Sequence, residues 1–379
     1  MRLALTGDQE FFRDTTARFL AEQVPAAEVR RLRDDPAGFE DDYWTRGAEL
    51  GWTSLLVAEA HGGGSISETG LVDLTLVADA FGRRAAPGPL IPTNVVAATL
   101  SDVDGVAWSA VLDALLTGSS VATWCVAEPV PSSGLGTVTL DVRVDGADVV
   151  LRGTKRPVES ADRADHLLVT GRTGDGLTQV LVPHDAPGVS ITPLRTLDLT
   201  RRFSVVLFDD VRLPARHVVG DVAGAGPQVE RQLQRSIVLG NAEAVGAMQA
   251  GFDMTVAWAF DRFSFGRPLA SYQALKHRFA DMLCWLEASH AIADEATDAV
   301  AAGTPDAGEL VSAAKAYIGH YGSELLQDCV QMHGGIGVTF EHDLHLFLRR
   351  HTVDRALFGT PSEHRRRLAD LLQAREDAA

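Results

Sequence analysis

The residues of this chain best suited to chemistry lie in its C-terminal half. Two adjacent glycines, Gly334 and Gly335, would let the backbone approach a ligand closely because neither carries a Cβ atom. The guanidinium of Arg262 could hold a phosphate oxygen or stack on a flat ring, and the amides of Gln273 and Gln331 could add hydrogen bonds. Residues of each of these types are able to contact phosphate groups or amides. The alternative interpretations are a helix-ending turn at the glycines and a surface ion pair at Arg262.

Metal and disulfide chemistry are not expected. His342 and His345 are three residues apart, as in some metal sites, but no further ligand lies nearby in the sequence, which favours a solvated helix face. Cys125, Cys284 and Cys329 lie far apart and form no CxxC pair. This pattern fits reduced thiols in a cytosolic protein.

Composition limits the classes of partner. The 379 residues are enough for two or three packed domains. A net charge of −17 argues against binding nucleic acid or an anionic membrane face, since both favour basic surfaces. A few local arginines could still hold an anionic ligand such as a coenzyme A thioester. No apolar stretch approaches the roughly 18 residues of a membrane span, and the N-terminus lacks the apolar core of a secretory signal, so we expect a cytoplasmic protein.

The elements that must position these residues begin with a helical region over residues 1–118. Thr6 and Gln9 resemble a capping box, in which each side chain bonds the backbone of the other residue at a helix start. Apolar residues follow at helical spacing, and further helices are predicted over residues 43–50 and 71–81.

The pattern changes to strands over residues 119–226. Apolar residues alternate with polar ones over residues 138–144, Asp145-Gly146 predicts a hairpin turn, and residues 149–151 predict the return strand. Short β-like runs follow at 166–170, 179–182 and 204–208. We therefore predict a compact antiparallel β domain.

Helical spacing returns over residues 227–379. Long amphipathic helices are predicted over residues 228–262, 271–302 and 307–332, and two shorter helices complete the chain. The predicted class is α+β, with a β domain between two helical domains.

Several segments resemble signature sequences of the acyl-CoA dehydrogenase family, in the same order along the chain. They are residues 124–129 (WCVAEP), 153–155 (GTK), 262–268 (RFSFGRP), 331–337 (QMHGGIG) and 358–360 (FGT). The resemblance covers nearly the whole chain. It implies an N-terminal helical domain, a middle β domain and a C-terminal four-helix bundle, which act on an acyl-CoA substrate in lipid metabolism such as fatty acid or steroid side-chain degradation. It also implies that an electron-transfer flavoprotein is the electron acceptor.

The resemblance further implies FAD as the cofactor, bound across a subunit interface of a tetramer. On this basis the chain would contact flavin through Ser133 and Thr360 of its own site. It would lend a second set of residues to the flavin of a neighbouring subunit. That set consists of Arg262, Phe265, Gln273, Gln331, Gly334 and Gly335.

The catalytic base of the family is missing from its usual position. The reaction removes a proton from the α carbon of the thioester and a hydride from the β carbon, so it needs a carboxylate base. Much of the family carries a glutamate directly before Gly-Thr, where this chain has Phe358. Some relatives carry it at a position matching Ser236. Glu243, two turns further along the same helix, is a candidate base, and a helix-packing ion pair is its alternative role.

The expected flavin side of this chain is altered as well. Ala127, Pro157 and Glu159 stand where relatives usually have a threonine, an aromatic residue and a threonine. A carboxylate at Glu159 would oppose the anionic reduced flavin. Some bacterial members of the family that act on bulky acyl-CoA substrates are heterotetramers in which two homologous chains share active sites and one carries the base. This chain resembles the partner without the base.

Two other interpretations stay open. One is a self-sufficient homo-oligomeric dehydrogenase that uses Glu243. The other is a chain of the same fold with different chemistry, such as a flavin oxidase or monooxygenase, or a purely structural subunit.

Overall fold

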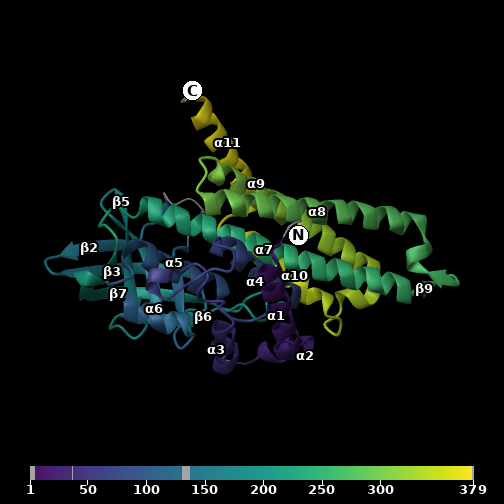
Figure 1. Cartoon of the computed structure of the whole chain (residues 1–379), viewed down its shortest axis with the longest axis horizontal. Coiled ribbons are helices and arrows are strands. Elements are labelled where there is room, and N and C mark those ends of the chain that lie inside the picture. Colours follow the sequence, from purple (N-terminus) through teal and green to yellow (C-terminus); the bar gives the residue numbers. More distant parts are fainter. Residues whose placement is uncertain (1–4, 36, 130–136, 378–379) are drawn as a thin grey trace.

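The computed structural model describes residues 5–35, 37–129 and 137–377. A β domain lies at one end of an elongated molecule, and the long C-terminal helices run from it to the opposite end (Figure 1). The predicted order of helices, strands and helices is confirmed. Among the described helices, none combines the length and the apolar character needed to cross a membrane.

Six α-helices form the N-terminal part. The predicted capping box is present at the start of the first one, where Gln9 N donates to Thr6 Oγ1 at 3.2 Å and Thr6 N donates to Gln9 Oε1 at 3.1 Å. The helices are α1 (Gly7–Gln23), α2 (Ala26–Leu32), α3 (Asp41–Glu49), α4 (Gly70–Arg84), α5 (Leu90–Asp104) and α6 (Ser109–Leu116).

One mixed sheet forms the β domain. Its strands are β1 (Ala122–Cys125), β2 (Asp141–Asp145), β3 (Asp148–Glu159), β4 (His166–Thr173), β5 (Gly176–Pro183), β6 (Val189–Pro193), β7 (Phe203–Pro214) and β8 (Val218–Val219). Their order is β6-β7-β3-β2-β4-β5-β8, with β1 beside β4. The predicted hairpin is confirmed, since Asp145 pairs with Asp148. Most ladders are antiparallel as predicted, but β1 and β2 pair with β4 in parallel, which periodicity alone does not reveal.

The C-terminal helices follow the predicted ranges closely. They are α7 (Gly226–Asp261), α8 (Gln273–Ala302), α9 (Ala307–His333), α10 (Leu344–Ala356) and α11 (Pro361–Asp377). A short hairpin of β9 (Phe263–Ser264) and β10 (Arg267–Pro268) joins α7 to α8 at the far end of the bundle.

Two glycines allow helix α4 of the N-terminal part to pack closely against helix α7 of the bundle. A Cβ on Gly82 of α4 would lie 1.9 Å from the carbonyl oxygen of Glu243, and a Cβ on Gly246 of α7 would lie 2.1 Å from that of Asp79. No side chain can occupy either position without moving a backbone, so α4 and α7 cross in direct contact.

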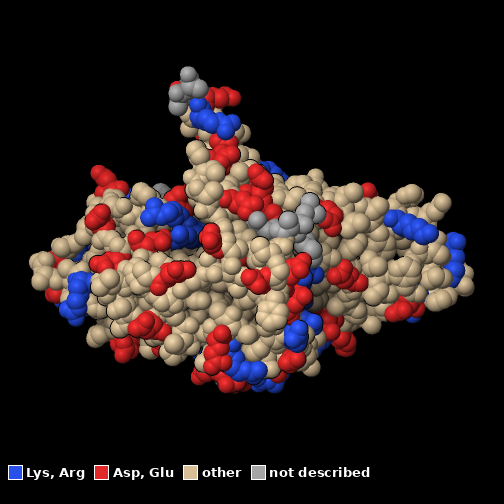
Figure 2. Space-filling view, in the orientation of Figure 1, with Lys and Arg blue, Asp and Glu red and all other residues tan. Residues whose placement is uncertain are grey.

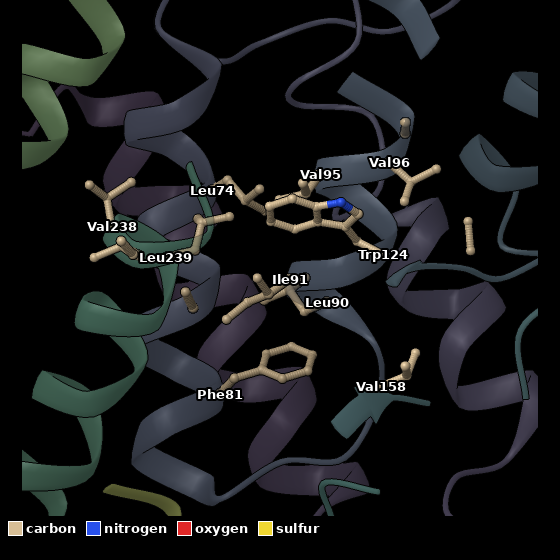
Figure 3. Packing of buried hydrophobic residues seen from close by; sticks show 14 of the residues in the cluster. Leu74, Phe81, Leu90, Ile91, Val95, Val96, Trp124, Val158, Val238 and Leu239 are labelled. Carbon is tan, nitrogen blue, oxygen red and sulfur yellow. The ribbon is translucent and has the colours of Figure 1, made fainter. Parts of the chain in front are cut away.

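The buried apolar core runs through all three parts of the chain. Trp124 of β1 lies among Ile91 and Val95 of α5, with Leu74 of α4 and Leu239 of α7 close by (Figure 3). Because strand β1 packs into this shared core, the segment that follows it is fixed against α5 and α7. That junction is where a cavity opens.

Candidate active site

A cavity of about 380 Å³ opens where the β domain meets the bundle. Its wall is largely apolar and comes from the segment after β1, from β3, from α7 and from the residues after α10. Lining side chains include Trp124, Phe203, Leu233, Leu357 and Phe358. This size lies within the range of small-molecule sites, roughly 300–1,000 Å³.

Phe358 stands in the wall of this cavity. Its ring stacks on Trp124 with centroids 6.0 Å apart and an angle of 18° between the planes. The backbone of Phe358 is in the left-handed region, with φ at +57°, and its carbonyl accepts a hydrogen bond of 2.9 Å from Nε2 of His364. Burial lowers the pKa of His364 to about 4, so its ring is neutral at pH 7. The side chain of Phe358 itself cannot accept a proton.

One carboxylate of the cavity wall, Glu128, accepts hydrogen bonds from a lysine and from two backbone N–H groups. Lys155 Nζ donates to it at 2.8 Å, and the backbone N–H groups of Thr139 and Leu140 donate at 2.9 Å. Burial raises the pKa of Glu128, but the charge and hydrogen bond of Lys155 outweigh that effect and lower it overall. Glu128 therefore acts as the counter-ion of a buried lysine.

The other two carboxylates of the wall also have partners. Glu159 accepts two hydrogen bonds from Arg201, at 2.8 Å from Nε and 2.5 Å from the second terminal nitrogen. Glu363 accepts from the backbone N–H of Thr360 at 2.8 Å and from its hydroxyl at 2.7 Å. Each described carboxylate that faces the cavity thus has at least two donors.

Glu243 does not line the cavity. Its side chain in α7 is 6% exposed and lies between two arginines: Arg350 donates to one oxygen, and Arg201 donates to the other at 3.2 Å. These contacts favour the ion-pair role over the role of a base. The sequence could not distinguish the two, because Arg201 and Arg350 are 42 and 107 residues away from Glu243.

The ion pairs of Glu243 belong to a larger set of buried charges. Arg350 Nε donates to Asp198 at 2.6 Å, Arg201 donates to Asp354, and Lys315 Nζ donates to the backbone carbonyl of Asp354. We call this set the buried charge network; it contains four carboxylates, Glu159, Asp198, Glu243 and Asp354, and three cations, Arg201, Lys315 and Arg350.

Protonation in the buried charge network is unequal. Burial, followed by the nearby charge of Glu243, raises the pKa of Asp354 well above its usual range. Burial lowers the pKa of Lys315 to about 8, although Asp354 opposes this effect. One oxygen of Asp354, Oδ2, has no hydrogen-bond partner among the described residues. Among the four carboxyl groups of the network, Asp354 is therefore the one whose protonated form the fold favours most.

The three positions that differ from relatives, Ala127, Pro157 and Glu159, all lie on the cavity wall. Ala127 and Pro157 line it without a polar side chain, and Glu159 adds a carboxylate. The hydroxyl of Thr360 is already donated to Glu363. Ser133 lies outside the described residues.

The far end of the bundle presents the other expected residues together. Arg262 follows α7, and its guanidinium lies 5.9 Å from the ring of Trp258. That ring stacks on His333 at 5.2 Å, directly before Gly334. Arg262 forms no ion pair with any described residue. Lys and Arg side chains gather at the end that carries β9 (Figure 2).

The remaining expected residues at this end are open to a ligand. Gln273 begins α8, Gln331 lies near the end of α9, and both are exposed. Phe265 is 98% exposed. A Cβ on Gly334 or Gly335 would meet no described atom within 4 Å, so the backbone there is accessible. These residues fit a ligand with phosphate and amide-bonding groups.

The two histidines considered for a metal pack on other rings. His342 lies 4.5 Å from the ring of His333, and His345 stacks on Phe340 at 4.5 Å. The sequence had instead predicted a solvated helix face for His342 and His345, without these ring contacts.

Of two further polar residues of the cavity, sequence reasoning missed Arg156 and considered Ser236 only as the position of an absent glutamate. Arg156 lines the cavity directly before Pro157, and Ser236 lines it from α7. Their neighbours along the chain were the only available signals: Arg156 follows the GTK segment, and Ser236 matches a position where some relatives carry a glutamate.

Comparison with known proteins gives a consistent result. Residues 6–103 match the family model of the acyl-CoA dehydrogenase N-terminal domain, and residues 227–372 match that of the acyl-CoA dehydrogenase C-terminal domain. The chain is 28% identical to the acyl-CoA dehydrogenase IpdE2 of Mycolicibacterium smegmatis, over 96% of this chain and 98% of that protein.

Solved structures share the fold. A Tcur3481–Tcur3483 steroid ACAD superimposes with a TM-score of 0.88 at 24% identity, covering 98% of this chain and 99% of the other. A glutaryl-CoA dehydrogenase from Mycobacterium smegmatis, solved in complex with FADH2, gives a TM-score of 0.87 at 21% identity, covering 98% and 95%.

Proposed function

Since this chain belongs to the acyl-CoA dehydrogenase family of FAD-dependent oxidoreductases, we propose that it serves the α,β-dehydrogenation of an acyl-CoA thioester as one half of a shared active site. A homologous chain supplies the catalytic base and the main flavin seat. This chain lends contacts to that flavin from the far end of its bundle.

The observation that carries the proposal is the wall of the cavity around Phe358. A phenyl ring stacked on Trp124 occupies the position of the family's usual base. The carboxylates Glu128, Glu159 and Glu363 are held by hydrogen bonds or ion pairs. A base must be free to receive the α proton, and none of these groups is placed to do so without losing a partner.

The lent half-site rests on Arg262, which has no ion-pair partner among the described residues, and on the accessible backbone of two glycines. Arg262 would hold a phosphate oxygen, and the open backbone at Gly334 and Gly335 would receive the pyrophosphate. Gln273 and Gln331 would add amide hydrogen bonds. When bound, FAD supplies the acceptor for the substrate hydride.

A self-sufficient homo-oligomer is the competing account. It would need Glu243 or a carboxylate of the cavity as base. Moving Glu243 away from its two arginines would break one buried ion pair of Arg201 and one of Arg350, which is costly although each arginine keeps another carboxylate partner. The contacts of Glu243 therefore oppose this account.

The substrate class follows from the same proposal. The steroid ACAD structure of the same fold is the reason to include a steroid-bearing acyl group among the candidate substrates. An electron-transfer flavoprotein would take up the electrons from the complex.

The test is dehydrogenase activity, followed with an artificial electron acceptor, on a panel of acyl-CoA thioesters that includes a steroid side-chain thioester. The chain alone should be inactive, and it should form an active complex with a homologous chain that keeps the glutamate before Gly-Thr. Changing that partner glutamate to glutamine should abolish activity. Phe358→Glu in this chain should not restore it, because the base would have no flavin opposite. Turnover by the purified chain alone would refute the proposal.

A further inference from the structure

Residues 334–343 connect the end of α9 to the start of α10 and begin with the two glycines of the lent half-site. We call them the connecting segment. Gly334 and Gly335 are exposed, and Val338 is 77% exposed. The middle of the segment is fixed from inside by Gly337, where a Cβ would lie 2.6 Å from the carbonyl oxygen of Val330 in α9. The contacts of its second half then decide how firmly the exposed backbone is held.

Helix α2, from the N-terminal part of the chain, holds that second half. Arg30 donates to the carboxylate of Asp343 through Nε at 3.0 Å and through a terminal nitrogen at 2.6 Å. Its two terminal nitrogens also donate to the backbone carbonyl groups of Phe340 and Glu341, the latter at 3.0 Å. One guanidinium, with its donors in a fixed geometry, therefore bonds three of four consecutive residues of the connecting segment.

The ring of Phe340 adds further contacts to the same helix. The guanidinium carbons of Arg30 and Arg33 lie 5.4 and 5.1 Å from its centroid, and His345 of α10 stacks on it at 4.5 Å. Helix α2 is itself anchored in the core, since Val29, the residue before Arg30, is 1% exposed. The N-terminal part thus grips the connecting segment across about 310 residues of sequence.

We propose that Arg30 is a positioning residue for the lent half-site. It holds residues 340–343 against α2 and so fixes the course of the chain between Gly335 and α10. The backbone N–H groups of Gly334 and Gly335 then stay in place for the flavin pyrophosphate of the neighbouring subunit. The inference rests on the proposed function, in which these glycines serve a neighbour's flavin, and it adds a role for the N-terminal part.

The test measures FAD release from the flavin-bearing assembly that this chain forms, whether with a homologue that keeps the glutamate or with itself. Released FAD is followed by its fluorescence after dilution. Arg30→Gln keeps a polar side chain but removes the charge, the paired bonds to Asp343 and the contact with the ring of Phe340. It should release FAD about fivefold faster than the wild type, the effect of about one net hydrogen bond.

Arg31→Gln is the matched control. Arg31 follows Arg30 on α2 and forms ion pairs with Glu28, Asp35 and Glu40, but none with the described residues of the connecting segment. This variant should release FAD at the wild-type rate. Kinetic constants separate positioning from general damage: in Arg30→Gln the FAD concentration for half-maximal dehydrogenase activity should rise about fivefold, while kcat at saturating FAD should stay unchanged.

A second measurement needs no flavin. In the full chain purified alone, amide hydrogen exchange over residues 336–343 should be faster in Arg30→Gln than in the wild type. It should be unchanged in Arg31→Gln. Exchange within α9 should be the same in all three proteins, because the change is confined to the connecting segment.

Equal FAD release from Arg30→Gln and Arg31→Gln would overturn the inference, and so would unchanged exchange over residues 336–343. A fall in kcat at saturating FAD would overturn it too, because that is the effect of a general loss of structure. Failure of the proposed function is read separately, as one FAD per chain in a homo-oligomer, where the comparison of the two variants still applies. A chain that carries flavin in no assembly would overturn both proposals.

Discussion

Replacing Asp354 by asparagine should stabilise this protein at neutral and alkaline pH. The side chain is 1% exposed and sits in the buried charge network, where four carboxylates meet three cations. Arg201 donates to one of its oxygens, while Oδ2 has no described partner. Burial and the charge of Glu243 raise the pKa of Asp354 well above its usual value. Asparagine reproduces the neutral acid and keeps an oxygen for Arg201.

The sign of the pH dependence follows from where the proton is bound. Below about pH 4 both the folded and the unfolded chain hold the proton on Asp354. Above that pH only the folded state holds it, so the free energy of unfolding falls by about 1.4 kcal/mol per pH unit until the folded group also ionises. Asparagine has no proton to lose. The advantage of Asp354→Asn over the wild type should therefore grow by up to about 1.4 kcal/mol per pH unit between about pH 5 and pH 8.

The assay is urea denaturation from about pH 5 to pH 8 at fixed protein concentration, with the difference in midpoint plotted against pH. Glu243→Gln is the matched control, because both oxygens of Glu243 accept from arginines. It should destabilise the protein by about 1–3 kcal/mol, since Arg201 and Arg350 each lose one carboxylate partner but keep Glu159 and Asp198. If Asp354→Asn loses as much stability as Glu243→Gln at every pH, Asp354 is ionised in the folded protein and the assignment of the proton is wrong.

Three further predictions concern the helix crossing, the lent half-site and the cavity wall. Gly246→Ala should lower stability by about 1–3 kcal/mol because its methyl group would meet the carbonyl of Asp79; an unchanged melting temperature would contradict the direct contact of α4 and α7. Arg262→Gln should reduce FAD retention by the complex with a glutamate-bearing homologue about tenfold, the loss of a charged phosphate contact, while the complex itself still forms; equal retention would show that Arg262 does not reach the phosphate. Lys155→Met should destabilise the chain by about 3–5 kcal/mol because Glu128 loses its buried cation, and a loss below about 1 kcal/mol in chemical denaturation would show that water replaces that cation.

The helices could be predicted from the sequence because the patterns that indicate them lie within each helix and at its ends. Apolar spacing and end signals such as Gly303 and the Gly334-Gly335 pair predicted helices that match α8 and α9 within about one or two residues. The Asp145-Gly146 turn fixed the β2–β3 hairpin in the same way. The parallel pairing of β1 with β4 was not readable, because it joins strands more than 40 residues apart and leaves no periodic trace.

The site was only partly readable, for the same reason. The missing base at Phe358 and the altered residues Ala127 and Glu159 follow from single positions in a recognisable segment. The partners of Glu243 and Glu159 do not, since Arg201 is a distant residue without a motif of its own. Ser236 was recognised as the position of an absent glutamate, but its place beside the cavity follows only from the fold.

The central claim is that this chain lends flavin contacts to a partner and does not seat a flavin itself. The most direct measurement is the FAD content per subunit of the chain purified alone, together with its oligomeric mass. The shared-site account predicts little or no FAD in the chain alone, and one FAD per pair of chains after co-expression with a homologue that keeps the glutamate. One FAD per chain in a homo-oligomer would contradict it and would show that the cavity beside Phe358 binds flavin without a partner.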